Sequence, residues 1–257
     1  GANDFFCLTS DRAAQIGIQS RHGVGCVMKA SDVKTPIFLK SDFDELAGGK
    51  RKSVLLAFSP DLNDREKIYV DQGAAAGLNR RYLLAQRKSW FAMEALSRAP
   101  IWAAVFGRSG MRFVLNQAGV CNLTAFHGIY PRIESQGFAA ALVACLNSRT
   151  VQALARQLLR VYGGGLLKVE PRDLLDLPVP DLARVGRRTI GRLERLLAER
   201  DHAVRAGRPI DVLEDELDKA VLAAGAEAAA SCARLGEQIL DKRRADGGTA
   251  AAPGEKS

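Results

Sequence analysis

Residues 138–159 read FAAALVACLNSRTVQALARQLL, an apolar run followed, after Asn147-Ser148, by an amphipathic stretch. Ala and Leu favour helix, whereas Asn and Ser compete for backbone hydrogen bonds. The stretch therefore predicts one apolar amphipathic helix, or two helices that meet at Asn147-Ser148. The glycines Gly163 to Gly165 predict the end of this helical region, because glycine accepts the left-handed conformation common at helix ends.

The residues after the glycines predict short elements and then a boundary. Leu166 to Val169 is typical of a short strand, and Pro171 with Asp173 indicates a one-turn helix. Leu177-Pro178-Val179-Pro180 then ends the compact part of the chain. Beyond it we expect helices, and a small, polar tail that is disordered; their ranges are 187–197, 213–230, 232–244 and, for the tail, 246–257.

The residues before the long apolar stretch have a different pattern, with short apolar runs broken by Gly, Pro and Asp. Such runs predict strands joined by loops. They are Phe5 to Leu8, Val24 to Met28, Pro36 to Leu39, Ser53 to Phe58, Ile101 to Phe106, Met111 to Leu115 and Ala118 to Cys121. Between them, Gly73 to Ser89 predicts a helix with its two basic doublets, Arg80-Arg81 and Arg87-Lys88, on roughly one side.

These patterns predict an α+β fold: a mixed, largely antiparallel sheet with packed helices, followed by a C-terminal helical segment. We expect residues 1–180 to form one domain and residues 181–245 the helical segment. The chain starts at Gly1 without an initiating Met, so we interpret it as a fragment of a longer protein.

Composition favours a globular protein with a polyanionic partner. Of 257 residues, 47% are hydrophobic and 26% charged, with 37 Lys and Arg against 29 Asp and Glu, for a net charge of +8. A basic surplus favours nucleic acid, since neutralised phosphates release counterions. The 5 Cys form no C-x-x-C pair, so we expect reduced thiols and no zinc site. No signal peptide or membrane span is indicated, and we expect a cytoplasmic protein.

Motifs for chemistry are absent from the sequence. There is no Gly-x-Ser-x-Gly elbow, no Walker loop and no His-rich cluster. Basic residues interleaved with aromatics and amides are present instead, and these residue types contact phosphates and base edges in duplex DNA. They are Arg80-Arg81-Tyr82, Arg87-Lys88-Ser89-Trp90-Phe91, Arg108, Arg112-Phe113 and Asn116-Gln117. We expect Trp90 and Phe113 to lie in the core.

Several phrases, in order, resemble the C-terminal target-recognition region of N6-adenine DNA methyltransferases, of the TaqI-like and fused restriction-modification type. The phrases are Gly1-Ala2-Asn3-Asp4-Phe5-Phe6, Arg87-Lys88-Ser89-Trp90, Arg112-Phe113-Val114-Leu115-Asn116, Ala118-Gly119, Leu146-Asn147-Ser148, Tyr162 to Pro171 and Leu174 to Pro180. The resemblance implies a sequence-specific, double-stranded DNA recognition module of a restriction-modification methyltransferase.

The departures from that family are equally informative. Its Asn-Pro-Pro-Tyr signature, which holds the flipped adenine, and its glycine-bearing cofactor loop are both missing. We therefore expect no catalytic residue, no metal and no cofactor in this chain. S-adenosylmethionine is expected for the missing catalytic domain. That domain is an implied partner besides DNA, and a nuclease domain or subunit is left open as another.

The residues expected to contact DNA follow from these patterns. Arg80, Arg81, Arg87 and Lys88 are expected at phosphates, whereas Arg108, Arg112 and Asn116 are expected nearer the base edges; Lys168 is a weaker candidate, since an ion pair explains it equally well. Asn147 and the three glycines are assigned to architecture. The chief alternative is a specificity subunit, or scaffold, of a type I-like restriction-modification complex, and an unrelated enzyme is a third.

Overall fold

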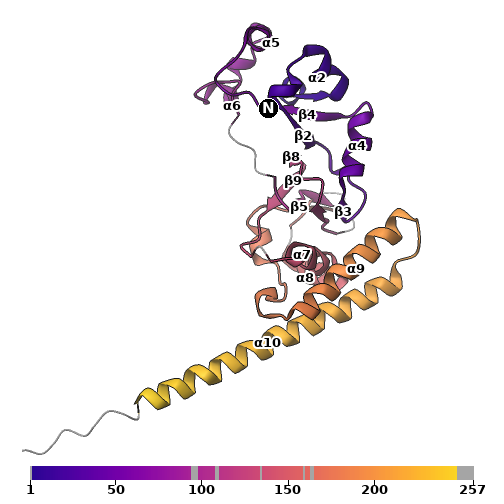
Figure 1. Cartoon of the computed structure of the whole chain (residues 1–257), viewed down its shortest axis with the longest axis vertical. Helices are drawn as coiled ribbons and strands as arrows, with labels where there is room; N and C mark the ends of the chain where they lie inside the picture. Colours follow the sequence, from indigo (N-terminus) through magenta and orange to yellow (C-terminus); the bar gives the residue numbers. More distant parts are fainter. Residues whose placement is uncertain are drawn as a thin grey trace, which may run out of the picture.

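The computed structural model describes residues 2–93, 98–107, 110–133, 135–158, 160–162 and 165–247. Figure 1 shows an elongated arrangement, with the N-terminal residues at one end, a sheet in the middle and helices at the other end. The mixed, mostly antiparallel sheets and packed helices confirm the predicted α+β class.

The N-terminal part is built on a sheet in the order β1-β4-β2-β8. Its strands are β1 (Cys7–Thr9), β4 (Lys52–Leu56), β2 (Gly23–Val27) and β8 (Cys121–Asn122). The first three pair antiparallel, while β2 and β8 are parallel. The accompanying helices are α1 (Asn3–Phe6), α2 (Ser10–Ile16), α3 (Gln19–His22), η1 (Ala30–Asp32), α4 (Lys40–Gly48), α5 (Asp64–Ala75), η2 (Leu78–Arg80) and α6 (Tyr82–Ala85).

Helix α5 is fixed to this part by its first turn. Asn63 accepts a hydrogen bond from the backbone of Glu66, and the Glu66 carboxylate accepts one from the Asn63 backbone, which is a capping box. The Glu66 side chain is buried and also binds the Arg21 guanidinium at 3.0 Å. Because a buried carboxylate requires such partners, these contacts set where α5 starts and how it is oriented.

The central sheet has the order β3-β7-β5-β9. Its strands are β3 (Ile37–Phe38), β7 (Phe113–Asn116), β5 (Ile101–Ala104) and β9 (Phe126–Ile129). Alternate residues face opposite sides: Ile101 and Ala103 join the core beneath the C-terminal helices, whereas Trp102 and Ala104 join a core on the other face. The sheet therefore links two hydrophobic layers.

The helical layer consists of α7 (Phe138–Asn147), α8 (Arg149–Leu158), α9 (Arg187–Arg205) and α10 (Asp211–Gly247), with the short helices η4 (Asp173–Asp176) and η5 (Leu182–Arg184). The predicted break at Asn147-Ser148 is confirmed. Ser148 is extended, and its hydroxyl donates to the Cys145 carbonyl at 2.7 Å. Asn147 exchanges hydrogen bonds with both backbone groups of Phe113, at 2.8 and 3.1 Å, and so anchors α7 to β7.

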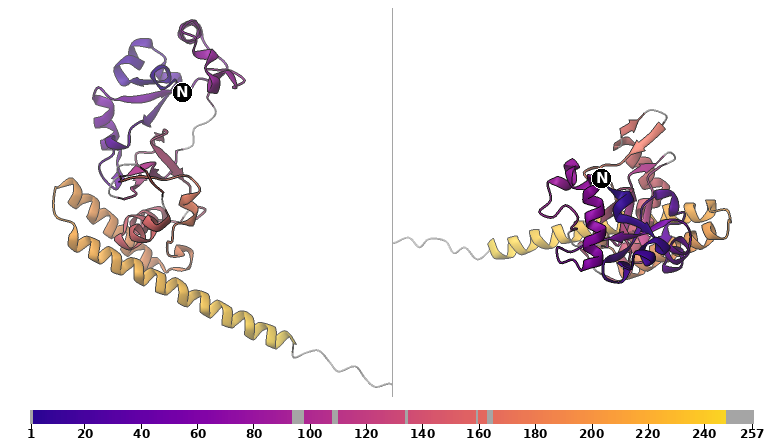
Figure 2. Two further views of the ribbon diagram at one scale, coloured as in Figure 1. Left: turned by 180° about the vertical axis from the view of Figure 1, so that it is seen from behind. Right: turned by 90° about the horizontal axis from the view of Figure 1, so that it is seen from above.

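A small sheet, ordered β10-β11-β6, stands apart from the other two; its strands are β10 (Arg160–Tyr162), β11 (Leu166–Lys168) and β6 (Phe106–Gly107). Figure 2, seen from above, shows a hairpin projecting from the side of the molecule. The predicted strand at 166–169 and the one-turn helix after Pro171 are confirmed. Gly163 and Gly164 lie outside the described residues.

The structure corrects several predicted elements. Of the strand predicted over 118–121, only Cys121 lies in a strand, β8. The expected helix 73–89 is wrong: α5 ends at Ala75, and Gly77 has a positive φ of 75°, which breaks the helix before Arg80. Phe5 and Phe6 belong to α1, so the first strand begins at Cys7. Helices 213–230 and 232–244 form one continuous α10 that reaches Gly247, and residues 248–257 of the predicted tail lie outside the described part.

The C-terminal helices share a core with the central sheet. Leu193, Leu197 and Leu217 are fully buried in the cluster that contains Ile101 and Phe113. The domain boundary at residue 180 stays a prediction. Residues before and after that position pack in the same hydrophobic core. Among the described helices, none alone is long and apolar enough to cross a membrane; only the pair Phe138–Asn147 and Arg149–Gln157, bent by 64°, meets that criterion jointly.

Candidate nucleic-acid interface

The segment Arg80–Lys88, called here the basic arm, connects α5 to the central part of the chain. Leu78, two residues before the arm, and Leu84, within α6, are buried in the N-terminal core and anchor the segment. The arm contains no acidic residue. Its four basic side chains, Arg80, Arg81, Arg87 and Lys88, are all exposed. The arm therefore presents cations from an anchored backbone.

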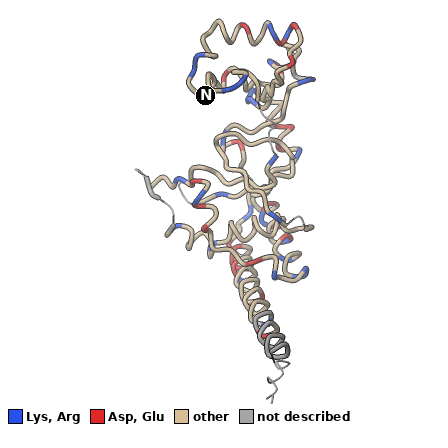
Figure 3. Tube along the Cα trace, turned by 90° about the vertical axis from the view of Figure 1, so that its left-hand side faces the viewer, with Lys and Arg blue, Asp and Glu red and all other residues tan. Residues whose placement is uncertain are grey.

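The basic arm lies beside the first residues of the chain. Lys52 donates a hydrogen bond to the Asp4 carboxylate at 2.6 Å. This bond, with a smaller contribution from the charge of Arg81, lowers the pKa of Asp4. Arg87 donates to the Ala92 carbonyl at 3.4 Å. Figure 3 shows Lys and Arg gathered next to the N-terminus at this end of the molecule.

Trp90 and Phe91, which follow the arm, pack against the N-terminal core. The ring of Trp90 lies 5.5 Å from that of Phe5, between centroids. A Cβ atom at Gly73 would lie only 2.6 Å from the Trp90 ring, so this close approach requires glycine. Phe113 is fully buried and Trp90 is half-buried against the core, which confirms the prediction for both aromatics. The tip of the arm differs, since Tyr82 is 76% exposed.

Two residues expected near base edges have structural roles instead. Asn116 is buried, and its side-chain amide donates to the carbonyls of Ala99 and Val120, both at 2.9 Å. Arg112 donates from its guanidinium to the carbonyls of Val33 and Ala30, and burial lowers its pKa. Both side chains therefore complete the packing around β7, and we do not retain them as base-reading candidates.

The remaining predicted positions are separate from the arm. Arg108 lies outside the described residues. Lys168, on β11, binds the Glu170 carboxylate at 3.1 Å, the ion-pair role already considered for it. The four cations thus share one exposed segment of the chain, whereas Lys168, Arg112 and Asn116 lie elsewhere in the fold.

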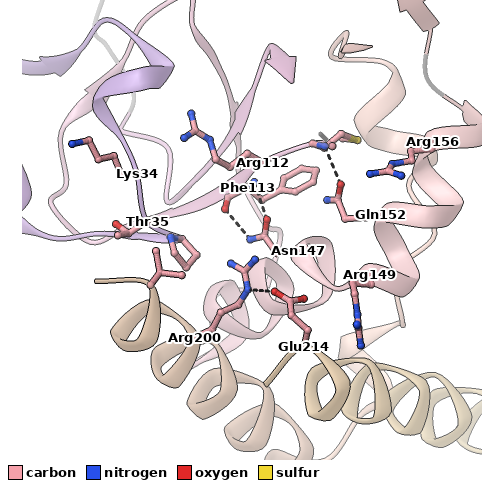
Figure 4. Close-up of a pocket in the computed structure, with 14 residues that line it drawn as sticks. Lys34, Thr35, Arg112, Phe113, Asn147, Arg149, Gln152, Arg156, Arg200 and Glu214 are labelled. Carbon is pink, nitrogen blue, oxygen red and sulfur yellow. Dashed lines mark hydrogen bonds and ion pairs between the residues drawn. The ribbon is translucent and has the colours of Figure 1, made fainter. Parts of the chain in front are cut away.

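A second basic feature was not found from the sequence. A cleft of about 380 Å³ lies between β3, β7 and the helices α8 to α10, and Figure 4 shows the side chains that point into it. Its charged lining is Lys34, Arg112, Arg149, Arg156, Arg200 and Glu214. These residues are far apart in sequence, from 34 to 214, so no local pattern signals the cleft.

The cations of this cleft are largely engaged with protein acceptors. Arg149 binds Asp215, and also Asp218 at 2.9 Å, while Arg200 binds Glu214 at 2.6 Å. These pairs join α8 and α9 to α10. Because these two arginines are held in ion pairs between helices, we consider the basic arm the stronger candidate for a phosphate-binding surface.

Comparisons with known proteins identify similar sequences. Residues 1–222 match the family model described as the C-terminal domain of type II methyltransferase M.Eco57I. The chain is 32% identical over 222 residues to type II methyltransferase M.AccI of Acinetobacter calcoaceticus, covering 85% of this chain and 41% of that protein. It is 28% identical over 126 residues to type II methyltransferase M.XamI of Xanthomonas campestris pv. amaranthicola, covering 49% and 23%.

The fold is similar to that of a solved restriction enzyme. The type IIG restriction endonuclease BpuSI superposes with a TM-score of 0.52 at 13% identity, over 89% of this chain and 29% of that one. At this identity the similarity concerns the fold alone. The chain spans less than half the length of each curated relative that it matches.

Proposed function

This chain belongs to the family of C-terminal domains of M.Eco57I-type type II methyltransferases, and we propose that it recognises a specific sequence in double-stranded DNA. The observation that carries the proposal is the basic arm: four exposed cations with no acid among them, on a segment anchored by buried leucines at Leu78 and Leu84. Such a surface suits the phosphates of a duplex, which fix the register of a protein on DNA.

We propose further that the chemistry resides outside this chain. Methyl transfer from S-adenosylmethionine to adenine N6 requires a cofactor site and a pocket for the flipped base. The sequence carries neither the Asn-Pro-Pro-Tyr signature nor the glycine-bearing loop that would supply them. The relatives are more than twice as long as the matched segment, which leaves room in them for a catalytic domain. In this proposal the chain positions the duplex and the catalytic domain methylates it.

The alternative of a specificity subunit that serves as a scaffold rests on one feature. Helix α10 has 37 residues, about 55 Å at 1.5 Å per residue, and Figure 1 shows its C-terminal part extending away from the body. Such a helix suits contact with another chain. The curated relative M.AccI favours the recognition module instead. In that type II methyltransferase the matched region is 41% of one longer polypeptide, and not a separate subunit.

The recognition proposal is tested by selection from a random pool. The chain is mixed with random duplexes, the retained DNA is sequenced, and the selection is repeated at rising salt. Enrichment of one short motif that contains adenine supports the proposal. Retention without any enrichment contradicts sequence recognition, and absence of retention contradicts duplex binding altogether. Adenine specificity is tested separately by mass spectrometry of DNA methylated by a longer relative in which this chain replaces the matched region.

A further inference from the structure

The first two residues of α6, Tyr82 and Leu83, which we call the tip of the basic arm, expose two large side chains next to each other in the sequence. Tyr82 is 76% exposed and Leu83 is 61% exposed, whereas the next residue, Leu84, is only 2% exposed. Helix α6 is thus held to the core by Leu84, and its first two residues face outwards. Large apolar side chains that stand together on a surface mark a contact with another molecule.

The charge around this pair indicates which molecule it contacts. Arg80 and Arg81 precede Tyr82 directly, and Arg87 with Lys88 follows after one turn. All four cations are exposed. A polyanion complements these exposed cations. A DNA duplex can in addition accept an apolar side chain between two stacked base pairs, where the flat faces of the bases lie. Another protein domain would need an acidic rim around an apolar pocket.

We propose that Tyr82 and Leu83 form an apolar wedge that presses against a base step of the duplex, while the four cations of the basic arm hold the flanking phosphates. The inference rests on the proposed function and deepens it. Apolar side chains inserted at a base step partly unstack it and bend the duplex. An unstacked step lowers the cost of extruding a neighbouring base. The basic arm would therefore help to extrude the target base as well as bind the duplex.

The test uses the whole chain and a duplex that carries the motif recovered by selection, with 2-aminopurine at each adenine in turn. This base analogue brightens when its stacking is lost. The unchanged chain is expected to raise the emission at one step. The variant Y82A/L83A is expected to abolish that rise, to bind about tenfold more weakly, and to keep the salt dependence of binding, because no phosphate contact is removed.

Matched variants keep the result interpretable. Y82F retains the ring and is expected to retain the emission rise. L222A removes an apolar side chain that is also 61% exposed, on α10, and is expected to change nothing. The wedge is overturned if the emission rise survives in Y82A/L83A. It is also overturned if the unchanged chain binds the duplex without any emission rise, which is the result expected if Tyr82 and Leu83 contact a protein domain instead. Failure of the unchanged chain to bind any duplex overturns the proposed function itself.

Discussion

Arg205 binds Asp42 through two parallel hydrogen bonds, from Nη1 to Oδ1 at 2.6 Å and from Nη2 to Oδ2 at 2.7 Å. The same guanidinium donates from Nε to Asp201 at 2.6 Å and from Nη2 to the Ile37 carbonyl at 2.7 Å. The backbone of Ile37 in turn donates to Asp201 at 2.9 Å. One side chain near the end of α9 therefore joins the start of α4 to the edge strand β3.

This contact predicts a specific acid dependence of stability. Burial raises the pKa of Asp42, but the hydrogen bonds from Arg205 and from the Leu39 backbone outweigh burial and leave the pKa lowered. A lowered folded pKa contributes stability above the unfolded pKa, which is about 4, and that contribution is lost as the pH falls through the folded value. In R205Q we expect less stability at neutral pH and a shallower loss below about pH 4.

Urea unfolding at neutral and acidic pH measures this effect. Asp4 and Glu227 also have lowered pKa values, but they remain in R205Q, so the difference between the two proteins isolates the Arg205 contact. Identical pH profiles for both proteins would show that the ion pair adds no pH-dependent stability.

Asn116 predicts a stability effect without an effect on base preference. Replacing Asn116 by Ala leaves the carbonyls of Ala99 and Val120 without their donor in a buried site, which should cost about 1–3 kcal/mol of unfolding free energy. The selected DNA motif should stay the same at temperatures where the variant is folded. A changed motif with unchanged stability would return Asn116 to the base-reading candidates.

The shared core predicts that α9 is part of the same cooperative unit as the central sheet. Leu193 is fully buried, so Leu193→Ala should lower the unfolding free energy by about 2–5 kcal/mol. The exposed Leu222, in the variant L222A, should change it by less than about 0.5 kcal/mol. Hydrogen exchange should show protection lost together in α9 and in β5 and β7. Loss confined to α9 and α10 would instead indicate an independent C-terminal domain beyond residue 180.

Thiol reactivity should distinguish one cysteine from the other four. Cys232 is exposed, whereas Cys7, Cys26, Cys121 and Cys145 are buried. Burial also raises the pKa of Cys145 to about 12, so a moderately alkaline buffer does not generate its thiolate. We expect one fast-reacting thiol with an aromatic disulfide reagent in the native chain, and none in C232S. Any fast-reacting thiol in C232S would contradict this expectation, because it would mean that the core around one of the four buried cysteines opens readily.

Local patterns predicted the elements whose cause is local. The break at Ser148 follows from Asn and Ser after an apolar run, and the strands β2, β3, β5 and β7 follow from short runs of β-branched and aromatic residues. The helix predicted over 73–89 failed because Gly77 adopts a positive φ, and a pattern cannot distinguish that glycine from one inside a helix. Contacts between residues far apart in the sequence could not be predicted either, because a local pattern does not contain the position of distant residues.

The candidate site shows this limit most clearly. The exposure of Arg80, Arg81, Arg87 and Lys88 agrees with their prediction as surface cations, although whether they touch phosphate stays a prediction. Arg112 was expected near base edges, but its acceptors are the carbonyls of Ala30 and Val33, about 80 positions earlier. The cleft lined by Lys34, Arg149 and Arg200 exists only because the fold brings distant segments together.

The central claim is that the basic arm binds the phosphates of a duplex, and a salt titration of binding tests it most directly. Affinity for a random duplex should fall steeply with salt, and in R87A/K88A the slope of log affinity against log salt should be smaller by about 2, close to 0.9 for each lost phosphate contact. The control R192A/R195A removes two exposed cations of α9 and should keep the original slope. An unchanged slope in R87A/K88A, or an equal change in the control, would contradict the account.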